Sequence, residues 1–197
     1  MAAVESQMLA LGTPAPAFAL PDYGQGGTGQ IVALADAAGE KATVVMFICN
    51  HCPFVRLVAD ELTRLANDYR GRGVGFVAVN ANDAAAYPDD RPEAMTREAR
   101  ERGYPFPYLF DESQEVAKAY TAACTPDFYV FDADLRLAYR GQLDDARPGN
   151  GKQPDGRDIR AALDALLNGR RPDERQLPSI GCNIKWKPGN APAYFSA

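Results

Sequence analysis

Two continuous apolar runs stand out along the chain, at residues 42–48 (ATVVMFI) and 74–80 (VGFVAVN). Unbroken apolar runs of this length are typical of strands that are buried on both faces of a parallel sheet. Between them, residues 53–70 place apolar side chains at helical spacing, and Gly71 follows as a stop signal. A helix between two buried strands predicts a βαβ unit.

Weaker patterns surround this unit and extend it. The chain before it predicts an N-terminal hairpin, and the chain after it predicts further helices and a second strand hairpin. In chain order these elements are strands 17–20 and 30–34, helix 92–102, strand 107–110, helix 114–120, strands 128–132 and 136–140, and helix 158–167. The order predicts an α/β fold with a central mixed β-sheet flanked by helices.

The last part of the chain, residues 171–197, differs in composition from the rest. It is rich in proline and polar residues, yet it carries the only tryptophan, Trp186, and contains Tyr194 and Phe195 near its end. A disordered tail rarely has so many aromatic side chains. We therefore expect residues 1–170 to form one domain that includes the hairpin, and residues 171–197 to form a tail packed on it.

Charge and composition exclude some classes of function. The 197 residues are 46% hydrophobic and carry a formal net charge of −5. This acidic balance argues against binding to nucleic acid or to an anionic membrane surface. The first 20 residues lack the pattern of a secretory signal, and no apolar run reaches membrane-spanning length, so we expect a cytoplasmic protein.

The candidate chemistry lies in the motif Cys49-Asn50-His51-Cys52, between a predicted buried strand and a predicted helix. Free backbone N–H groups and the positive end of the helix dipole favour an anion at such a junction. The thiolate is the reactive form of cysteine, so this position favours reactivity. The spacing also brings the two sulfur atoms within reach of a disulfide. The motif therefore predicts a redox-active dithiol that exchanges with other disulfides.

The order of the residues in the motif suggests a role for each. Cys49 is the more N-terminal cysteine, and we expect it to be exposed and to attack the substrate. Cys52, one turn into the helix, is then the resolving thiol. His51 is the only histidine of the chain. As a cation or a hydrogen-bond donor it stabilises a thiolate, and therefore the reduced form, which raises the reduction potential.

Two other interpretations of the motif compete with this one. A Cys-x-x-Cys pair can be half of a zinc site, but a structural zinc takes four ligands, and the remaining cysteines, Cys124 and Cys182, are isolated. The two cysteines of the motif can also be inert core residues. We favour the dithiol and expect neither a bound metal nor an organic cofactor.

The chain resembles the thioredoxin superfamily, and more closely the bacterial thioredoxin-like group related to the peroxiredoxins of the alkyl hydroperoxide reductase/TSA type. The resemblance rests on residues 47–53 (FICNHCP), on Thr125-Pro126 before a predicted strand, and on the N-terminal hairpin. It implies a thioredoxin-like fold in which a cis proline, here Pro126, faces the dithiol. It also implies that the exposed backbone of Thr125 pairs with an extended partner strand.

The sequence departs from the thioredoxin pattern at two places. Ile48 stands where thioredoxins usually have tryptophan, and residues 43–46 lack the buried acid that many thioredoxins use for proton transfer. Asp144 and Asp145 are candidate substitutes, although a solvated acidic turn is the favoured interpretation of that pair.

The peroxiredoxins are the nearest rival family. Their peroxidatic cysteine ends the pattern Pro-x-x-x-Thr-x-x-Cys, which would place it at Cys52. Here Cys49 takes the place of the threonine and Val45 the place of the proline. The resemblance therefore argues against an efficient peroxidase.

Cys124 and Cys182 leave several possibilities open. Cys124 lies two residues before Pro126, and Cys182 lies in an apolar and aromatic part of the tail. Each can be a further redox thiol, through a Cys124–Cys182 pair or a relay to Cys49, or an inert core residue.

These observations predict a thiol-disulfide oxidoreductase whose site is formed by Cys49, Cys52, His51, Thr125 and Pro126. We expect its partners to be a protein or small-molecule disulfide and a thiol electron donor, not nucleic acid or a membrane. The alternatives are a peroxiredoxin-like thiol peroxidase with antioxidant activity and a redox-inactive binding module. The sequence leaves the oligomeric state open.

Overall fold

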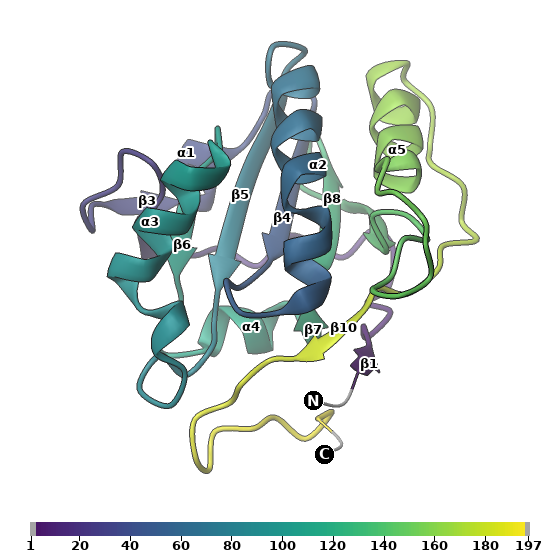
Figure 1. Cartoon of the computed structure of the whole chain (residues 1–197). Coiled ribbons are helices and arrows are strands. Elements are labelled where there is room, and N and C mark those ends of the chain that lie inside the picture. The colour runs from purple at the N-terminus through teal and green to yellow at the C-terminus, as the bar shows by residue number, and fades with distance from the viewer. Residues whose placement is uncertain (1–2, 196–197) are drawn as a thin grey trace.

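The core of the protein is a five-stranded mixed sheet in the order β6-β5-β4-β8-β9, which we describe from a computed structural model covering residues 3–195 (Figure 1). The central strand β4 (Ala42–Phe47) is parallel to β5 (Val74–Asn80) and antiparallel to β8 (Asp127–Asp132). All six residues of β4 are buried. The sheet is completed by β6 (Tyr108–Phe110) and β9 (Leu137–Gly141). The predicted mixed sheet is therefore confirmed.

Helices cover both faces of this sheet. On one face lie α2 (Pro53–Arg70), α3 (Pro92–Arg102) and α5 (Arg157–Leu167), whose apolar side chains join one core. On the other face lie α1 (Leu34–Ala37) and α4 (Glu115–Ala119). The front view in Figure 1 shows α2 and α5 in front of the sheet. The sheet thus has a core on each side, which explains why its central strands are apolar without interruption.

The start of α2 and the end of α3 follow from local sequence. Pro53 occupies the first turn of α2, where its missing N–H costs nothing, and Cys52 is the N-cap. At the end of α3, Gly103 adopts the left-handed conformation (φ 64°), which glycine tolerates best. Both helices have the predicted bounds.

The predicted N-terminal hairpin is present as β2 (Ala19–Pro21) and β3 (Ile31–Ala33), which pair antiparallel. Its second strand ends earlier than predicted, because Leu34 begins α1. The structure also contains a short 3-10 helix, η1 (Pro88–Asp90), which no sequence pattern predicts.

A second, smaller sheet brings the two ends of the chain together. Its order is β1 (Ala3–Glu5), β10 (Ile180–Asn183) and β7 (Cys124–Thr125), and all its pairs are antiparallel. Figure 1 shows this sheet below the lower end of α2, where the dithiol motif lies. The tail therefore contributes the middle strand of a sheet next to the motif. The division into residues 1–170 and 171–197 stays a prediction.

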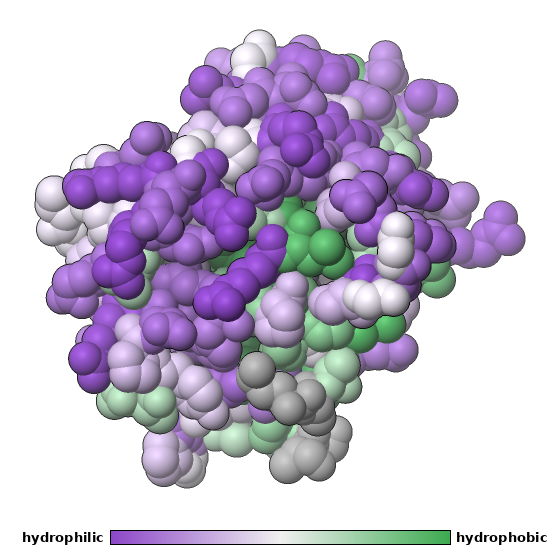
Figure 2. Space-filling view, viewed as in Figure 1, coloured by the Kyte–Doolittle hydropathy of each residue, from purple (hydrophilic) through white to green (hydrophobic). Residues whose placement is uncertain are grey.

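The surface of the protein is predominantly hydrophilic on the face shown in Figure 2, with a small apolar area near its middle. Within residues 3–195, none of the helices combines the length and the apolar character that a membrane crossing requires.

Candidate functional site

The dithiol motif forms the loop between β4 and α2, and its backbone is held by polar contacts. The backbone N–H of Asn50 donates to Asp90 Oδ1 at 2.8 Å, and the Asn50 side-chain amide donates to the carbonyl of Asp89 at 2.7 Å. Arg56 Nε in turn donates to the Asn50 carbonyl at 3.0 Å. Cys49 and Cys52 are therefore presented by a fixed loop at the start of a long helix.

The residue before Pro126 lies against both sulfur atoms of the motif. The Thr125–Pro126 peptide bond is cis, as the resemblance implies. Cys49 Sγ lies 3.3 Å from Thr125 Oγ1, and Cys52 Sγ donates to the Thr125 carbonyl at 3.2 Å. The structure thus brings together four predicted site residues from two distant parts of the chain: Cys49, Cys52, Thr125 and Pro126.

The backbone of Thr125 is not open to an external strand, contrary to the prediction. It already pairs with β10, in which Cys182 lies opposite Thr125 and Asn183 lies opposite Cys124. Gly181 approaches so closely that a Cβ atom there would lie 2.0 Å from the Thr125 carbonyl oxygen. The tail of the chain occupies the position that the resemblance assigns to a partner.

The expectation that Cys49 is exposed is also wrong. Its exposed fraction is 2%, and that of Cys52 is 0%. The reason is tertiary: β10 and Thr125 cover the loop that would otherwise face solvent.

The thiol pKa values of Cys49 and Cys52 also differ from the prediction, in which Cys49 is the reactive thiol. Hydrogen bonds from the thiols of Cys182 and Cys49 hold the pKa of Cys52 well below its ordinary value, against the effect of burial, and the Val55 N–H at the start of α2 adds to them. Burial raises the pKa of Cys49, and the contact with Cys52 and the charge of Asp90 raise it further. Cys52 is therefore the more acidic thiol of the pair.

A buried carboxylate that the sequence analysis missed lies beside Cys49. Asp90, in η1, accepts hydrogen bonds from the Asn50 N–H, from His51 Nδ1 at 2.6 Å and from the side-chain amide of Asn82 at 2.8 Å. Although burial favours its neutral form, these bonds lower the pKa of Asp90. A buried carboxylate thus lies beside the dithiol, but it comes from η1 and not from β4. Nothing in the local sequence around Asp90 indicates this position.

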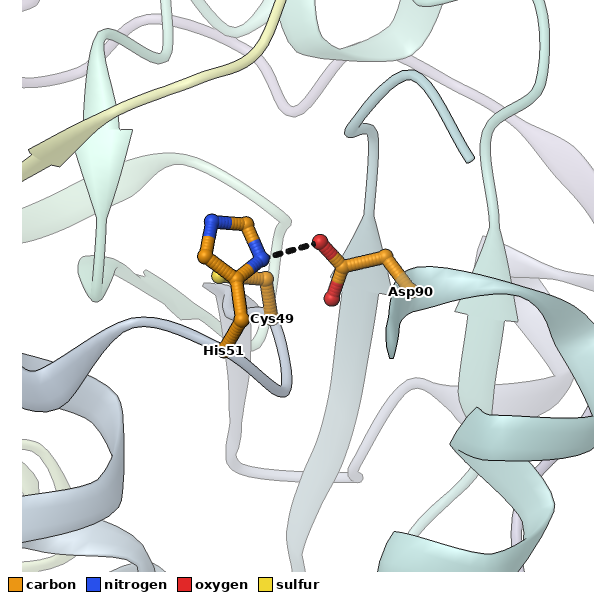
Figure 3. A group of neighbouring side chains, drawn as sticks. All are labelled: Cys49, His51 and Asp90. Atoms are coloured by element: carbon orange, nitrogen blue, oxygen red, sulfur yellow. Dashed lines mark hydrogen bonds and ion pairs between the residues drawn. The ribbon is translucent and has the colours of Figure 1, made fainter. Parts of the chain in front are cut away.

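His51 faces away from the sheet and toward Asp90. Figure 3 shows the imidazole in front of Cys49, with Nδ1 directed at the Asp90 carboxylate. Its ring also stacks on Tyr87, with centroids 5.2 Å apart and the planes inclined by 10°. Two contacts therefore fix the orientation of the histidine next to the dithiol.

The same three residues are the candidates for a metal. Within residues 3–195, Cys49, His51 and Asp90 offer one ligand atom each, and these atoms lie within 4.8 Å of one another. A zinc ion at the motif would therefore use this group, with His51 and Asp90, rather than the two cysteines alone.

The two isolated cysteines lie near the motif but on different faces of the small sheet. Cys182 is opposite Thr125, so both side chains point to the same face, toward Cys49 and Cys52. Cys124 precedes Thr125 and points to the other face; its thiol donates to the Pro126 carbonyl at 3.6 Å. This arrangement does not support the Cys124–Cys182 pair.

Asp144 and Asp145 do not replace the missing acid. Asp144 is buried and accepts hydrogen bonds from the backbone of Ala146, Asp155 and Gly156. It is therefore a structural residue of this loop. The interpretation of Asp144 as part of a solvated turn is wrong. Asp145 is exposed and pairs with Lys152.

An apolar hollow borders the site on the outside. Its lining is formed by α2, the loop after β9 and the start of β10 and includes Phe54, Val58, Pro126, Leu143 and Ile180. The view in Figure 2 has a small apolar area in a hydrophilic surface near the same elements. The hollow places apolar surface beside the cis proline.

Comparison with known proteins places the chain among thiol redox families. Residues 11–140 match the family model described as AhpC/TSA family. No curated protein matches the sequence. An uncharacterized conserved protein from Geobacillus kaustophilus is 63% identical, with a TM-score of 0.93 over 96% of this chain and 98% of that one. A hypothetical protein from Sinorhizobium meliloti 1021 is 51% identical, with a TM-score of 0.90 over 94% and 99%.

A more distant structure identifies the fold. The thioredoxin domain of a thiol-disulfide oxidoreductase from Bacteroides vulgatus is 21% identical, with a TM-score of 0.57, and the match covers 68% of this chain and 90% of that domain. This similarity confirms the predicted thioredoxin-like fold.

Proposed function

This chain belongs to the AhpC/TSA family, and from that premise we propose that it is a thiol-disulfide oxidoreductase that uses the Cys49–Cys52 couple by mixed-disulfide exchange. The observation that carries the proposal is the contact of both sulfur atoms with Thr125, the residue before cis-Pro126. A pair of inert core cysteines would need neither the helix N-terminus nor this contact. The geometry therefore supports a redox role for the pair.

The exchange proceeds in two balanced steps. Cys49, once deprotonated, attacks one sulfur of a substrate disulfide, which forms a mixed disulfide and releases the other sulfur as a thiolate. Cys52 then attacks Cys49 Sγ, which forms the Cys49–Cys52 disulfide and releases the second substrate thiolate. The substrate thiolate released in the first step takes up the proton of Cys49, and the low pKa of Cys52 supplies the thiolate for the second step.

A thiol electron donor closes the cycle by reversing these steps. Because β10 covers Thr125, a small-molecule disulfide fits the closed site better than a protein disulfide. We propose the cytoplasm as the location of this activity, as the sequence predicts, and no nucleic acid or membrane as a partner.

One observation favours a second candidate, a thiol peroxidase. Cys52 occupies the place of the peroxidatic cysteine in the peroxiredoxin pattern, and its lowered pKa is the property that such a cysteine needs. The threonine and proline of that pattern are replaced by Cys49 and Val45. We therefore rank this activity second.

The test is a side-by-side assay of three substrates with dithiothreitol as donor: insulin, a small disulfide and hydrogen peroxide. We expect reduction of the small disulfide, and its loss in Cys49→Ser and Cys52→Ser but not in the control Cys124→Ser. Activity on peroxide alone would favour the second candidate. Activity on none of the three substrates would contradict both.

A further inference from the structure

The strand β10 carries a third cysteine into the dithiol site. Cys49, Cys52 and Cys182 belong to one buried apolar core that does not include Cys124, and Cys182 lowers the pKa of the neighbouring Cys52 thiol. Helix α2, which begins beside Cys52, packs against β10. Three buried cysteine side chains therefore meet near the start of α2.

Cys182 is held there by the structure on both sides of it. Toward the N-terminal side, Ser179 Oγ donates to the Gly141 carbonyl at 2.6 Å, and β1 pairs along β10 from Glu5 to Ala3. Toward the C-terminal side, the backbone N–H of Lys185 donates to Asn82 Oδ1 at 2.8 Å. The contact between Cys182 and Cys52 is thus a fixed feature of the fold.

The position of Cys182 is also the position expected for a substrate. Cys182 lies opposite Thr125 in an antiparallel strand pair. A residue of an extended partner strand would take the same position when that strand pairs with the backbone of Thr125. The close approach of Gly181 to the Thr125 carbonyl leaves no room for another strand. The chain therefore presents a cysteine of its own to its dithiol.

We propose that Cys182 is a third redox thiol, which exchanges with the Cys49–Cys52 disulfide to form a Cys52–Cys182 disulfide. This inference rests on the proposed function, because that reaction supplies the first disulfide. In the exchange, Cys182 attacks Cys52 Sγ, the Cys52–Cys182 bond forms, and the Cys49–Cys52 bond breaks. Cys49 leaves as a thiolate and takes up the proton that Cys182 loses. No electrons enter or leave, so no further reagent is needed.

The consequence is that Cys49 returns to the reduced form while the two oxidising equivalents stay in the protein. The disulfide is then shared between the motif and the tail strand. Cys124 takes no part, because its side chain points to the other face of the small sheet.

Peptide mapping tests the proposal directly, because trypsin separates the motif from Cys124 and from Cys182. Cys49 and Cys52 fall in peptide 42–56, Cys124 in peptide 119–136 and Cys182 in peptide 176–185. The full chain is oxidised with diamide, its remaining thiols are alkylated with iodoacetamide, and the digest is analysed by mass spectrometry. Cys49→Ser isolates the new pair, Cys182→Ser isolates the motif pair, and Cys124→Ser is the matched control.

We expect oxidation of Cys49→Ser to lower its alkylatable thiols from three to one and to link peptide 42–56 to peptide 176–185. The same linked pair should appear in the wild-type protein and in Cys124→Ser, which makes the result independent of any folding defect in Cys49→Ser. Absence of that link in all three proteins, or a link from Cys52 to Cys124, would overturn the proposal.

Cys182→Ser distinguishes a failure of the proposed exchange with Cys182, here called the relay, from a failure of the proposed function. If this variant forms the Cys49–Cys52 disulfide while Cys49→Ser keeps all three thiols, the relay is wrong and the proposed function stands. If Cys182→Ser forms no disulfide under the same oxidation, the proposed function fails together with the relay.

Discussion

The two faces of the ribbon formed by β7 and β10 are close in space and differ in chemistry. One face carries Thr125 and Cys182 toward the dithiol. The other carries Cys124, next to Asp127, which follows the cis proline. Cys124 and Cys182 are both isolated in sequence and both buried. The comparison teaches that burial of a cysteine says little about its role until the face on which it lies is known.

The buried carboxylates on the two sides of this ribbon also differ, because their pKa values are shifted in opposite directions. Asp90, beside Cys49, is surrounded by hydrogen-bond donors, and its pKa is lowered in spite of burial. Burial raises the pKa of Asp127 to about 7, although Tyr129 Oη donates to it at 3.2 Å. The dithiol side therefore holds a charged carboxylate at neutral pH, whereas the carboxyl group on the other side titrates near neutral pH.

The largest expected effect concerns Asp127. Between the pKa of an unfolded carboxyl, about 4, and about 7, the folded protein binds a proton that the unfolded chain has lost. The free energy of unfolding should therefore fall as pH rises through this window, by on the order of 4 kcal/mol for this group. Asp127→Asn should remove that fall. Urea unfolding of both proteins from pH 4 to pH 8 measures it, and parallel curves would contradict the assignment.

The second prediction tests whether β10 shields the dithiol on one face of the ribbon. Gly181→Val should push β10 away from Thr125, because the added Cβ would overlap the Thr125 carbonyl oxygen. We expect Gly181→Val to lower the free energy of unfolding by up to about 3 kcal/mol. In this variant Cys49 and Cys52 should be alkylated faster than Cys124. Gly26→Val is the matched control, since a Cβ at Gly26 meets nothing within 4 Å. Equal alkylation rates in the two variants would show that β10 does not shield the dithiol.

Asp90 gives the third prediction, opposite in sign to the first. Its lowered pKa stabilises the fold above the pKa of an unfolded carboxyl, and this stabilisation is lost as pH falls through the folded pKa. Asp90→Asn should therefore cost about 2 kcal/mol at neutral pH, and less in acid. It should also lower the pKa of Cys49, because it removes a nearby negative charge.

Two measurements check this variant. Urea unfolding gives the stability at each pH, and the pH dependence of alkylation gives the thiol pKa. A difference between wild type and Asp90→Asn that grows in acid would refute the lowered pKa, and an unchanged pKa of Cys49 would exclude the influence of the carboxylate.

The smallest expected effect is that of His51. If it stabilises a thiolate of the motif, His51→Gln should lower the reduction potential of the dithiol by about 20 mV, which corresponds to about 1 kcal/mol. Tyr87→Phe is the control, because it keeps the ring that stacks on His51. Equilibration with glutathione measures the potential of each protein. An unchanged or raised value for His51→Gln would rule out the proposed tuning.

Much of the fold could be predicted because its signals are local. The apolar run of β4, the spacing of apolar residues in α2 and the glycine after α3 each lie within one element. The dithiol motif was found in the same way, since its chemistry depends on the junction of a strand and a helix. The short strand β10 gave no such signal, because four residues with a central glycine have neither a clear alternation nor an apolar run.

The sequence by itself determined that this protein has a mixed α/β core with a cysteine pair at a helix start and a proline beside it. Only the tertiary structure decided what surrounds that pair. It brings Asp90 from η1 and Cys182 from the tail to the motif, closes the site and places the low pKa on Cys52. The physical reason is that burial, hydrogen bonding and charge at a thiol depend on groups far away in sequence, which no local pattern encodes.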